Sequence, residues 1–76
     1  MIEKEVWVLM SPDNEHWDED YAVNVVAKYS GYAGVIATET NKTRDMGFGQ
    51  ERMYIVKGKE EENVNWFIEI LNEHLY

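Results

Sequence analysis

The chain has 76 residues, no cysteine and a formal net charge of −8. A chain of this length buries only about 60% of its unfolded surface, so residues 1–76 are expected to form one small acidic domain. Because cysteine is absent, disulfides, thiolate zinc sites and cysteine nucleophiles are excluded. The negative charge disfavours nucleic acid and anionic membranes as general partners, since both are bound through Lys and Arg.

The sequence contains no candidate membrane segment. No run approaches the roughly 20 apolar residues that a membrane-spanning helix needs. Residues 1–5 also lack the basic and then apolar order of a secretion signal. We therefore expect an unprocessed, cytoplasmic protein.

The first half of the chain predicts a strand and then a helix. Residues 6–10 are rich in strand-forming side chains and end at a turn-forming run, residues 11–14. From Asp18, a plausible N-cap, the apolar residues fall at helical spacing, and Ser30 with Gly31 supplies the stop. These apolar residues are Ala22, Val25, Val26 and Tyr29.

The second half predicts a hairpin and a second helix. Residues 32–40 and 52–57 read as strands, joined by a long polar stretch that includes Gly47 and Gly49. Three carboxylates at residues 60–62 suit the first turn of a helix. An apolar stripe then runs to the end of the chain: Val64, Phe67, Ile68, Leu71 and Leu75.

The predicted order β-α-β-β-α indicates an α+β domain. A right-handed crossover followed by a hairpin gives a split β-α-β arrangement, in which a three-stranded antiparallel sheet has the order 1-3-2 and two helices on one face. This topology resembles a truncated ferredoxin-like fold without its last strand. The first strand is left at an open edge, where a target or a second copy can add a strand.

The predicted strands are apolar on both alternating faces, whereas a strand wetted on one side should alternate. Two helices cover only one face, so the other face needs a partner. We assign Trp7 and Leu9 to this second face. A homodimer is the simplest way to cover it.

Two tryptophans are predicted to lie outside the core, beside carboxylates. Trp66 falls opposite the apolar stripe of its helix, and Trp17 falls just before the first helix. The neighbouring carboxylates are Glu62, Glu69 and Glu73 for Trp66, and Asp18, Glu19 and Asp20 for Trp17. Trp is enriched at interface anchors, so both sets are candidate contacts for a basic protein partner. The alternatives are a hydrophobic staple for Trp17 and a solvated acidic face.

Positive charge is concentrated in residues 42–59. That segment holds five of the seven basic residues against two acidic ones, a net charge of +3, which leaves −11 for the rest of the −8 chain. Met46 and Phe48 lie between glycines at the hairpin tip and suggest a docking finger. An alternative is that the hairpin contacts nucleic acid, with Phe48 or Tyr54 stacking on bases. A third possibility is that the basic hairpin of one copy pairs with the acidic helices of another.

The sequence favours a binding protein over an enzyme. It has no glycine-rich phosphate motif and no paired metal-binding histidines, so we assign no catalytic residue, no metal and no cofactor. The leading hypothesis is a small inhibitor that occludes a larger macromolecule, with mimicry of nucleic acid as one way in which it could do so. In general character it resembles the inhibitors that phages and mobile elements deploy against host nucleases and defence complexes. The alternative is a small-molecule-sensing regulatory module of the ACT type, with its ligand at a dimer interface, to which Gly31 and Gly34 would be suited.

Overall fold

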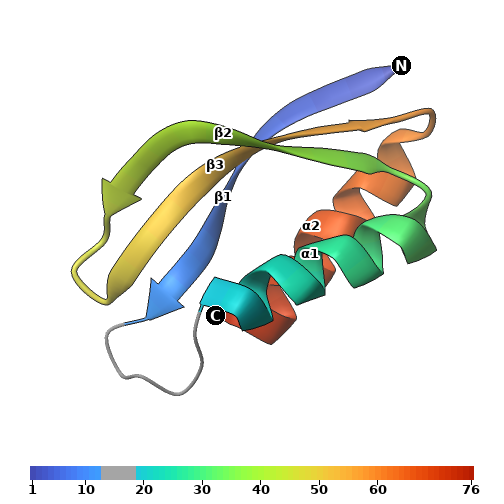
Figure 1. Ribbon diagram of the computed structural model, residues 1–76. Coiled ribbons are helices and arrows are strands. Elements are labelled where there is room, and N and C mark those ends of the chain that lie inside the picture. Colours follow the sequence, from blue (N-terminus) through green and yellow to red (C-terminus); the bar gives the residue numbers. More distant parts are fainter. Residues whose placement is uncertain (13–18) are drawn as a thin grey trace.

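The computed structural model describes residues 1–12 and 19–76 of the chain. The elements follow one another as β1 (Ile2–Pro12), α1 (Glu19–Ala33), β2 (Ile36–Asp45), β3 (Gly49–Gly58) and α2 (Glu61–Leu75). Figure 1 shows the three strands as one twisted sheet with both helices on the same side of it. The predicted order β-α-β-β-α is confirmed.

The sheet has the order β1-β3-β2, and β3 pairs antiparallel with both neighbours. Trp7 of β1 lies opposite Met53 of β3, and Thr38 of β2 lies opposite Ile55 of β3. The predicted class, a three-stranded antiparallel sheet in the order 1-3-2 with two helices, is therefore confirmed. Both β1 and β2 are edge strands of this three-stranded sheet.

The hairpin is tighter than the sequence predicts. The strands predicted at residues 32–40 and 52–57 are wrong in their bounds, because β2 runs on to Asp45 and β3 begins at Gly49. Gly47, at φ 84°, lies in the short connection, and its N–H donates to Oδ1 of Asp45 at 2.9 Å. The polar residues at the end of β2 remain in a strand because their backbone groups pair with β3. This pairing does not depend on the polarity of the side chains.

The first helix also continues beyond its predicted stop at Ser30 and Gly31. It ends at Ala33, and Gly34 follows in the left-handed region at φ 68°. The N–H of Val35 donates to the carbonyl of Ser30 at 3.0 Å, and the N–H of Gly34 donates to that of Gly31 at 3.4 Å. This pair of bonds is the Schellman motif. It requires a left-handed residue, best suited to glycine, at position 34; position 31 is ordinary helix.

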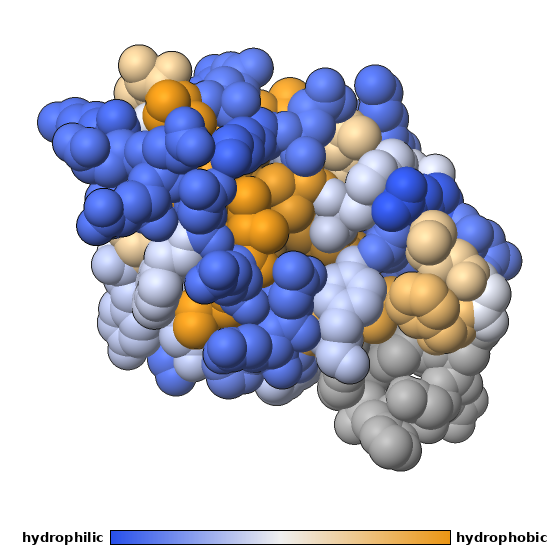
Figure 2. Space-filling view, turned by 180° about the vertical axis from the view of Figure 1, so that it is seen from behind, coloured by the Kyte–Doolittle hydropathy of each residue, from blue (hydrophilic) through white to orange (hydrophobic). Residues whose placement is uncertain are grey.

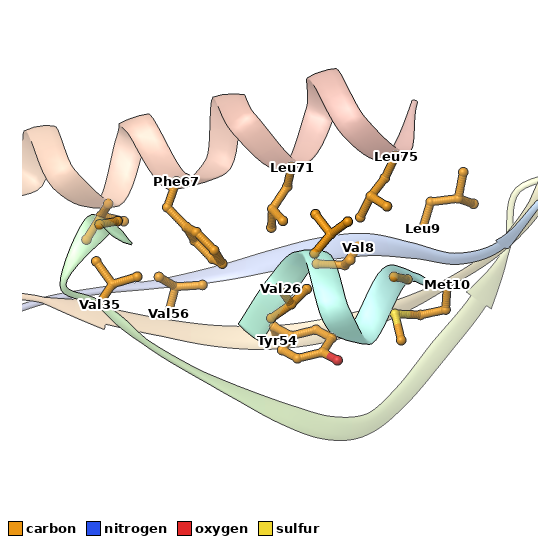
Figure 3. Packing of buried hydrophobic residues seen from close by; sticks show 14 residues of the cluster. Val8, Leu9, Met10, Val26, Val35, Tyr54, Val56, Phe67, Leu71 and Leu75 are labelled. Atoms are coloured by element: carbon orange, nitrogen blue, oxygen red, sulfur yellow. The ribbon is translucent and has the colours of Figure 1, made fainter. Parts of the chain in front are cut away.

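The core lies between the helices and the inner face of the sheet. Val64, Phe67, Leu71 and Leu75 of α2 are all buried, which confirms the predicted apolar stripe. In Figure 3, Phe67 and Leu71 extend from α2 toward the sheet, where Val8 and Val56 lie. Gly58 allows α2 to approach closely, since a Cβ there would lie 2.8 Å from Cγ2 of Val64.

The assignment of Leu9 to an open sheet face is wrong. Leu9 is buried and belongs to the core cluster together with Leu75. The pairing of β1 with β3 shifts register between Leu9 and Ser11, and the hydroxyl of Tyr76, just after α2, lies 3.5 Å from the carbonyl of Trp7. Trp7, by contrast, is only partly buried and lies outside the core cluster. On the side shown in Figure 2, apolar side chains reach the surface between strongly hydrophilic ones.

Candidate protein-binding surface on the helices

Four ring-bearing side chains gather where α1 and α2 lie side by side, and we call them the aromatic ridge: Tyr29, Tyr32, Trp66 and His74. Tyr29 is at the centre. Its ring stacks on His74 with a centroid distance of 4.9 Å, and it meets Tyr32 and Trp66 edge to face at 5.7 and 6.4 Å. These contacts hold the two outer aromatic rings in defined positions while parts of them remain accessible to a partner.

Trp66 lies on the exposed side of α2, as the sequence predicts. It is 40% exposed, although Tyr29 packs against one edge of its ring. Glu62, Glu69 and Glu73 are exposed on the same helix. Residues four before and three after Trp66 share its face, so Glu62 and Glu69 flank the indole. The structure therefore brings together an anchor-type aromatic side chain and the carboxylates predicted to surround it.

Tyr32 is part of the ridge, and the sequence prediction missed it. It is 70% exposed. The sequence pattern predicts a strand from residue 32, because Ser30 and Gly31 resemble a helix stop. The signal that marks it as helical is the continued spacing of Val26, Tyr29 and Ala33, which keeps the apolar face in register for one more turn.

An open pocket of about 220 Å³ adjoins the ridge. It is lined by Tyr21, Asn24, Val25, Lys28, Tyr29 and His74. Nζ of Lys28 lies 5.4 Å from the centroid of the Tyr29 ring. Lys28 is the lysine of α1, so the aromatic ridge has one positive side chain on the pocket side and carboxylates near Trp66.

The second predicted cluster is described only in part. Trp17 and Asp18 lie outside the described residues. Glu19 and Asp20 are exposed in the first turn of α1, where carboxylates are favoured by the helix dipole. Glu19 also forms an ion pair with Nη1 of Arg52 at 3.2 Å. Its carboxylate therefore already has a positively charged neighbour within the chain.

The hairpin tip carries exposed apolar side chains, as predicted for a docking finger. Met46 is exposed, and Phe48 is 50% exposed. The Phe48 ring meets the Tyr76 ring edge to face at 6.2 Å. Phe48 thus packs against the end of the chain as well as facing solvent, and this contact fixes the tip relative to α2.

The arginines of the basic segment bind carboxylates of their own chain. Nη1 of Arg52 lies 2.9 Å from Glu39, in addition to its contact with Glu19. Nε of Arg44 lies 2.7 Å from Glu51. The positive charge that the sequence concentrates in residues 42–59 is therefore partly offset by these ion pairs.

One tyrosine beside Arg52 has a strongly shifted pKa. The Tyr54 hydroxyl donates to Oε2 of Glu39 at 3.0 Å. Burial, and then the hydrogen bond to the Glu39 carboxylate, raise the pKa of Tyr54 to about 12. The phenol stays protonated and serves as a hydrogen-bond donor that orders Glu39, not as an acid or base near neutral pH.

The fold and surface together define a class: a small α+β domain with an acidic, aromatic surface on its two helices. Within residues 1–12 and 19–76, no three His, Asp or Glu side chains lie close enough together to hold a metal ion. No helix in that part of the chain is long and apolar enough to cross a membrane. No protein-family model, no curated protein and no solved structure matches this chain.

Proposed function

We propose that this chain is an acidic protein-binding module that inhibits a larger macromolecule by covering a basic surface with its two helices. The observation that carries the proposal is the aromatic ridge, in which Trp66 and Tyr32 are exposed yet held in place by Tyr29. Fixed aromatic side chains lose little conformational entropy on binding, and for this reason they are common interface anchors.

The charge of the helices defines the chemistry of the partner. The exposed carboxylates Glu62, Glu69 and Glu73 lie on the same helix as Trp66, and the chain as a whole carries −8. Such a field speeds association with a positively charged surface and suppresses binding to an acidic one. A basic surface with an apolar centre fits this arrangement.

A basic surface of this kind commonly serves to bind nucleic acid, so the module would act as a nucleic-acid mimic. Glu62, Glu69 and Glu73 are spaced by about 10 and 6 Å along the helix axis at 1.5 Å per residue. These carboxylates would pair with Lys and Arg side chains that otherwise neutralise phosphates. In this general character the chain is similar to the inhibitors that phages and mobile elements direct against host nucleases and defence complexes.

The proposal is tested by comparing what the immobilised wild type, Trp66→Ala, Ile36→Ala and Phe48→Ala capture. Ile36→Ala is the matched control, because it removes a 63% exposed apolar side chain from the sheet, away from the two helices; Phe48→Ala tests the docking finger separately. The expected partner is retained by the control and lost with Trp66→Ala, with an affinity loss of about 30-fold or more for an anchor worth 2 kcal/mol. Added wild-type chain should then displace nucleic acid from that partner.

Two results would contradict the proposal. One is a partner that Trp66→Ala binds as tightly as the wild type does. The other is a partner that keeps its full activity and its nucleic acid when it is saturated with the chain.

The two alternatives receive less support from the structure. Arg44 and Arg52 already bind carboxylates, which disfavours nucleic-acid contact through the hairpin. An ACT-type sensing module would use glycines near its ligand. Here Gly34 ends α1 in a left-handed conformation, so a role in the fold already accounts for this glycine. The open pocket beside Tyr29 is the feature that a small ligand would use in that alternative.

A further inference from the structure

No helix of the described chain covers the outer face of the sheet (Figure 1). The registers place three rows of side chains on this face: Glu3, Lys57 and Ile36; Glu5, Ile55 and Thr38; and Trp7 with Met53. Ile36 is 63% exposed, and Trp7, Met53 and Ile55 are partly exposed. These four apolar residues all lie outside the core cluster and its packed neighbours.

The outer face is closed at the hairpin end and open at the other. Glu51 lies on the same face of β3 as Met53 and Ile55, because alternate residues of a strand face the same side. It is nevertheless buried, because the Tyr76 hydroxyl and Arg44 cover it. The Arg44 guanidinium carbon also lies 4.3 Å from the centroid of the Trp7 ring. An open patch remains, which we define as Trp7, Met53, Ile55 and Ile36 with the charged residues Glu3, Glu5 and Lys57.

Charge decides which partner the open patch fits. Glu3, Glu5 and Lys57 give it a net charge of −1, and Nζ of Lys57 already lies 3.5 Å from Glu3. On the two helices the charged residues sum to −5: Glu19, Asp20, Lys28, Glu61, Glu62, Glu69 and Glu73. Two chains of −8 repel each other when they approach through their helices, and much less when they approach through the open patch.

The arrangement of the strands is compatible with two-fold symmetry. A two-fold axis parallel to the strands sets β1 of one copy against β2 of the other, because β3 is central. Glu5 of one copy then faces the uncharged Thr38 region of its partner, and apolar side chains meet at the centre. Sheets packed in this way lie about 10 Å apart and keep their strands within about 30°.

The size of the face sets the strength of the contact. The open patch is about five residues long, roughly 17 Å, and three strands span about 14 Å, so a pair of patches would bury roughly 500 Å². Stable interfaces generally bury about 1,200 Å² or more, and smaller ones are weak and reversible. The expected dimer is therefore concentration-dependent.

We propose that two copies of this chain pair through the open patch, with Trp7, Met53 and Ile55 at the centre of the contact. The helices face outward in this dimer, so it presents two aromatic ridges on opposite sides. The inference does not depend on the proposed function, because it uses the other face of the molecule.

The test is the solution mass from light scattering over a concentration series reaching the millimolar range. We expect the wild-type mass to rise toward twice the monomer mass, and Ile55→Lys to remain monomeric. Trp66→Lys is the matched control, because it adds the same charge on the helix side, and it should dimerise like the wild type. Ile36→Asp provides a second variant at a more exposed position, in case Ile55→Lys does not fold.

Three outcomes would overturn the inference: a wild-type chain that stays monomeric throughout, a folded Ile55→Lys or Ile36→Asp that dimerises as the wild type does, or a dimer that Trp66→Lys alone dissociates. Circular dichroism of each variant establishes that it is folded. Failure of this test leaves the partner assay on the helix surface unaffected, since the variant that decides that assay, Trp66→Ala, leaves the open patch unchanged.

Discussion

The Tyr76 hydroxyl donates a hydrogen bond to the carboxylate of Glu51, which is 4% exposed and also accepts from Nε of Arg44 at 2.7 Å. This contact joins the end of α2 to the two strands of the hairpin. Burial and the Glu51 carboxylate raise the pKa of Tyr76, so the phenol remains a donor over the whole physiological range. The same contact closes one end of the outer sheet face.

Glu51→Ala should lower the free energy of unfolding by roughly 1–3 kcal/mol, because it leaves Arg44 and the Tyr76 hydroxyl without their buried acceptor. Tyr76→Phe should lose about 1 kcal/mol, the usual net value of one hydrogen bond. Urea unfolding measures both. Tyr32→Phe is the control and should change stability by less than about 0.5 kcal/mol, since its side chain is largely exposed. Equal losses for all three variants would show that the contact has no special role.

Adjacent residues in α2 should respond in opposite ways to truncation. Phe67 is fully buried, and Phe67→Ala should lower the free energy of unfolding by roughly 3–5 kcal/mol. Trp66→Ala should cost much less, because its ring is partly in solvent and meets Tyr29 only edge to face. Chemical denaturation monitored by circular dichroism gives both values. Complete unfolding of Trp66→Ala would contradict the role of Trp66 as an exposed anchor.

Changing each of two glycines to alanine should alter the free energy of unfolding in opposite directions. A Cβ at Gly58 would lie 2.8 Å from Cγ2 of Val64 and 2.9 Å from Cγ1 of Val35, so Gly58→Ala should destabilise by about 1–3 kcal/mol. A Cβ at Gly31 meets no atom within 4 Å, and Gly31 lies inside α1. Gly31→Ala should therefore stabilise by roughly 0.5–1 kcal/mol. Thermal unfolding of the two variants beside the wild type decides the matter, and a stabilising Gly58→Ala would mean that α2 does not approach β3 this closely.

The stability of the wild type should fall at alkaline pH. Tyr54 has a pKa raised from its ordinary 10.0 to about 12, so between these values the folded chain keeps a proton that the unfolded chain has lost. The contribution is complete below pH 10 and decreases as pH rises toward 12, by an amount on the order of 2 kcal/mol.

Unfolding free energies from pH 8 to 12 should therefore fall less steeply for Tyr54→Phe than for the wild type. Tyr76 contributes a dependence of the same sign, because its pKa is raised as well. If the free energy of unfolding of Tyr54→Phe falls with pH as steeply as that of the wild type, Tyr54 is not a source of the effect.

Much of the fold follows from local patterns in the sequence. The apolar stripe of α2 and the alternation of strands and helices are local signals, and they predict the element order and the sheet order correctly. The ends of the elements are less predictable. Ser30 and Gly31 resemble a helix stop, but the bonds that end α1 are made by Gly34 and Val35.

The candidate site likewise has features that local sequence patterns predict and features that depend on tertiary packing. The sequence alone determines that Trp66 lies outside the core among Glu62 and Glu69, because the helical repeat fixes which residues share a face. Only the tertiary structure decides that Tyr29 and Tyr32 join Trp66, since helix packing brings residues 29 and 66 together. Likewise, only the tertiary structure buries Leu9 and Glu51, because Leu9 joins the core cluster that includes Leu75, and the hydroxyl of Tyr76, just after α2, bonds to Glu51. Periodicity within an element is a local property, whereas contact between elements depends on how the whole chain packs.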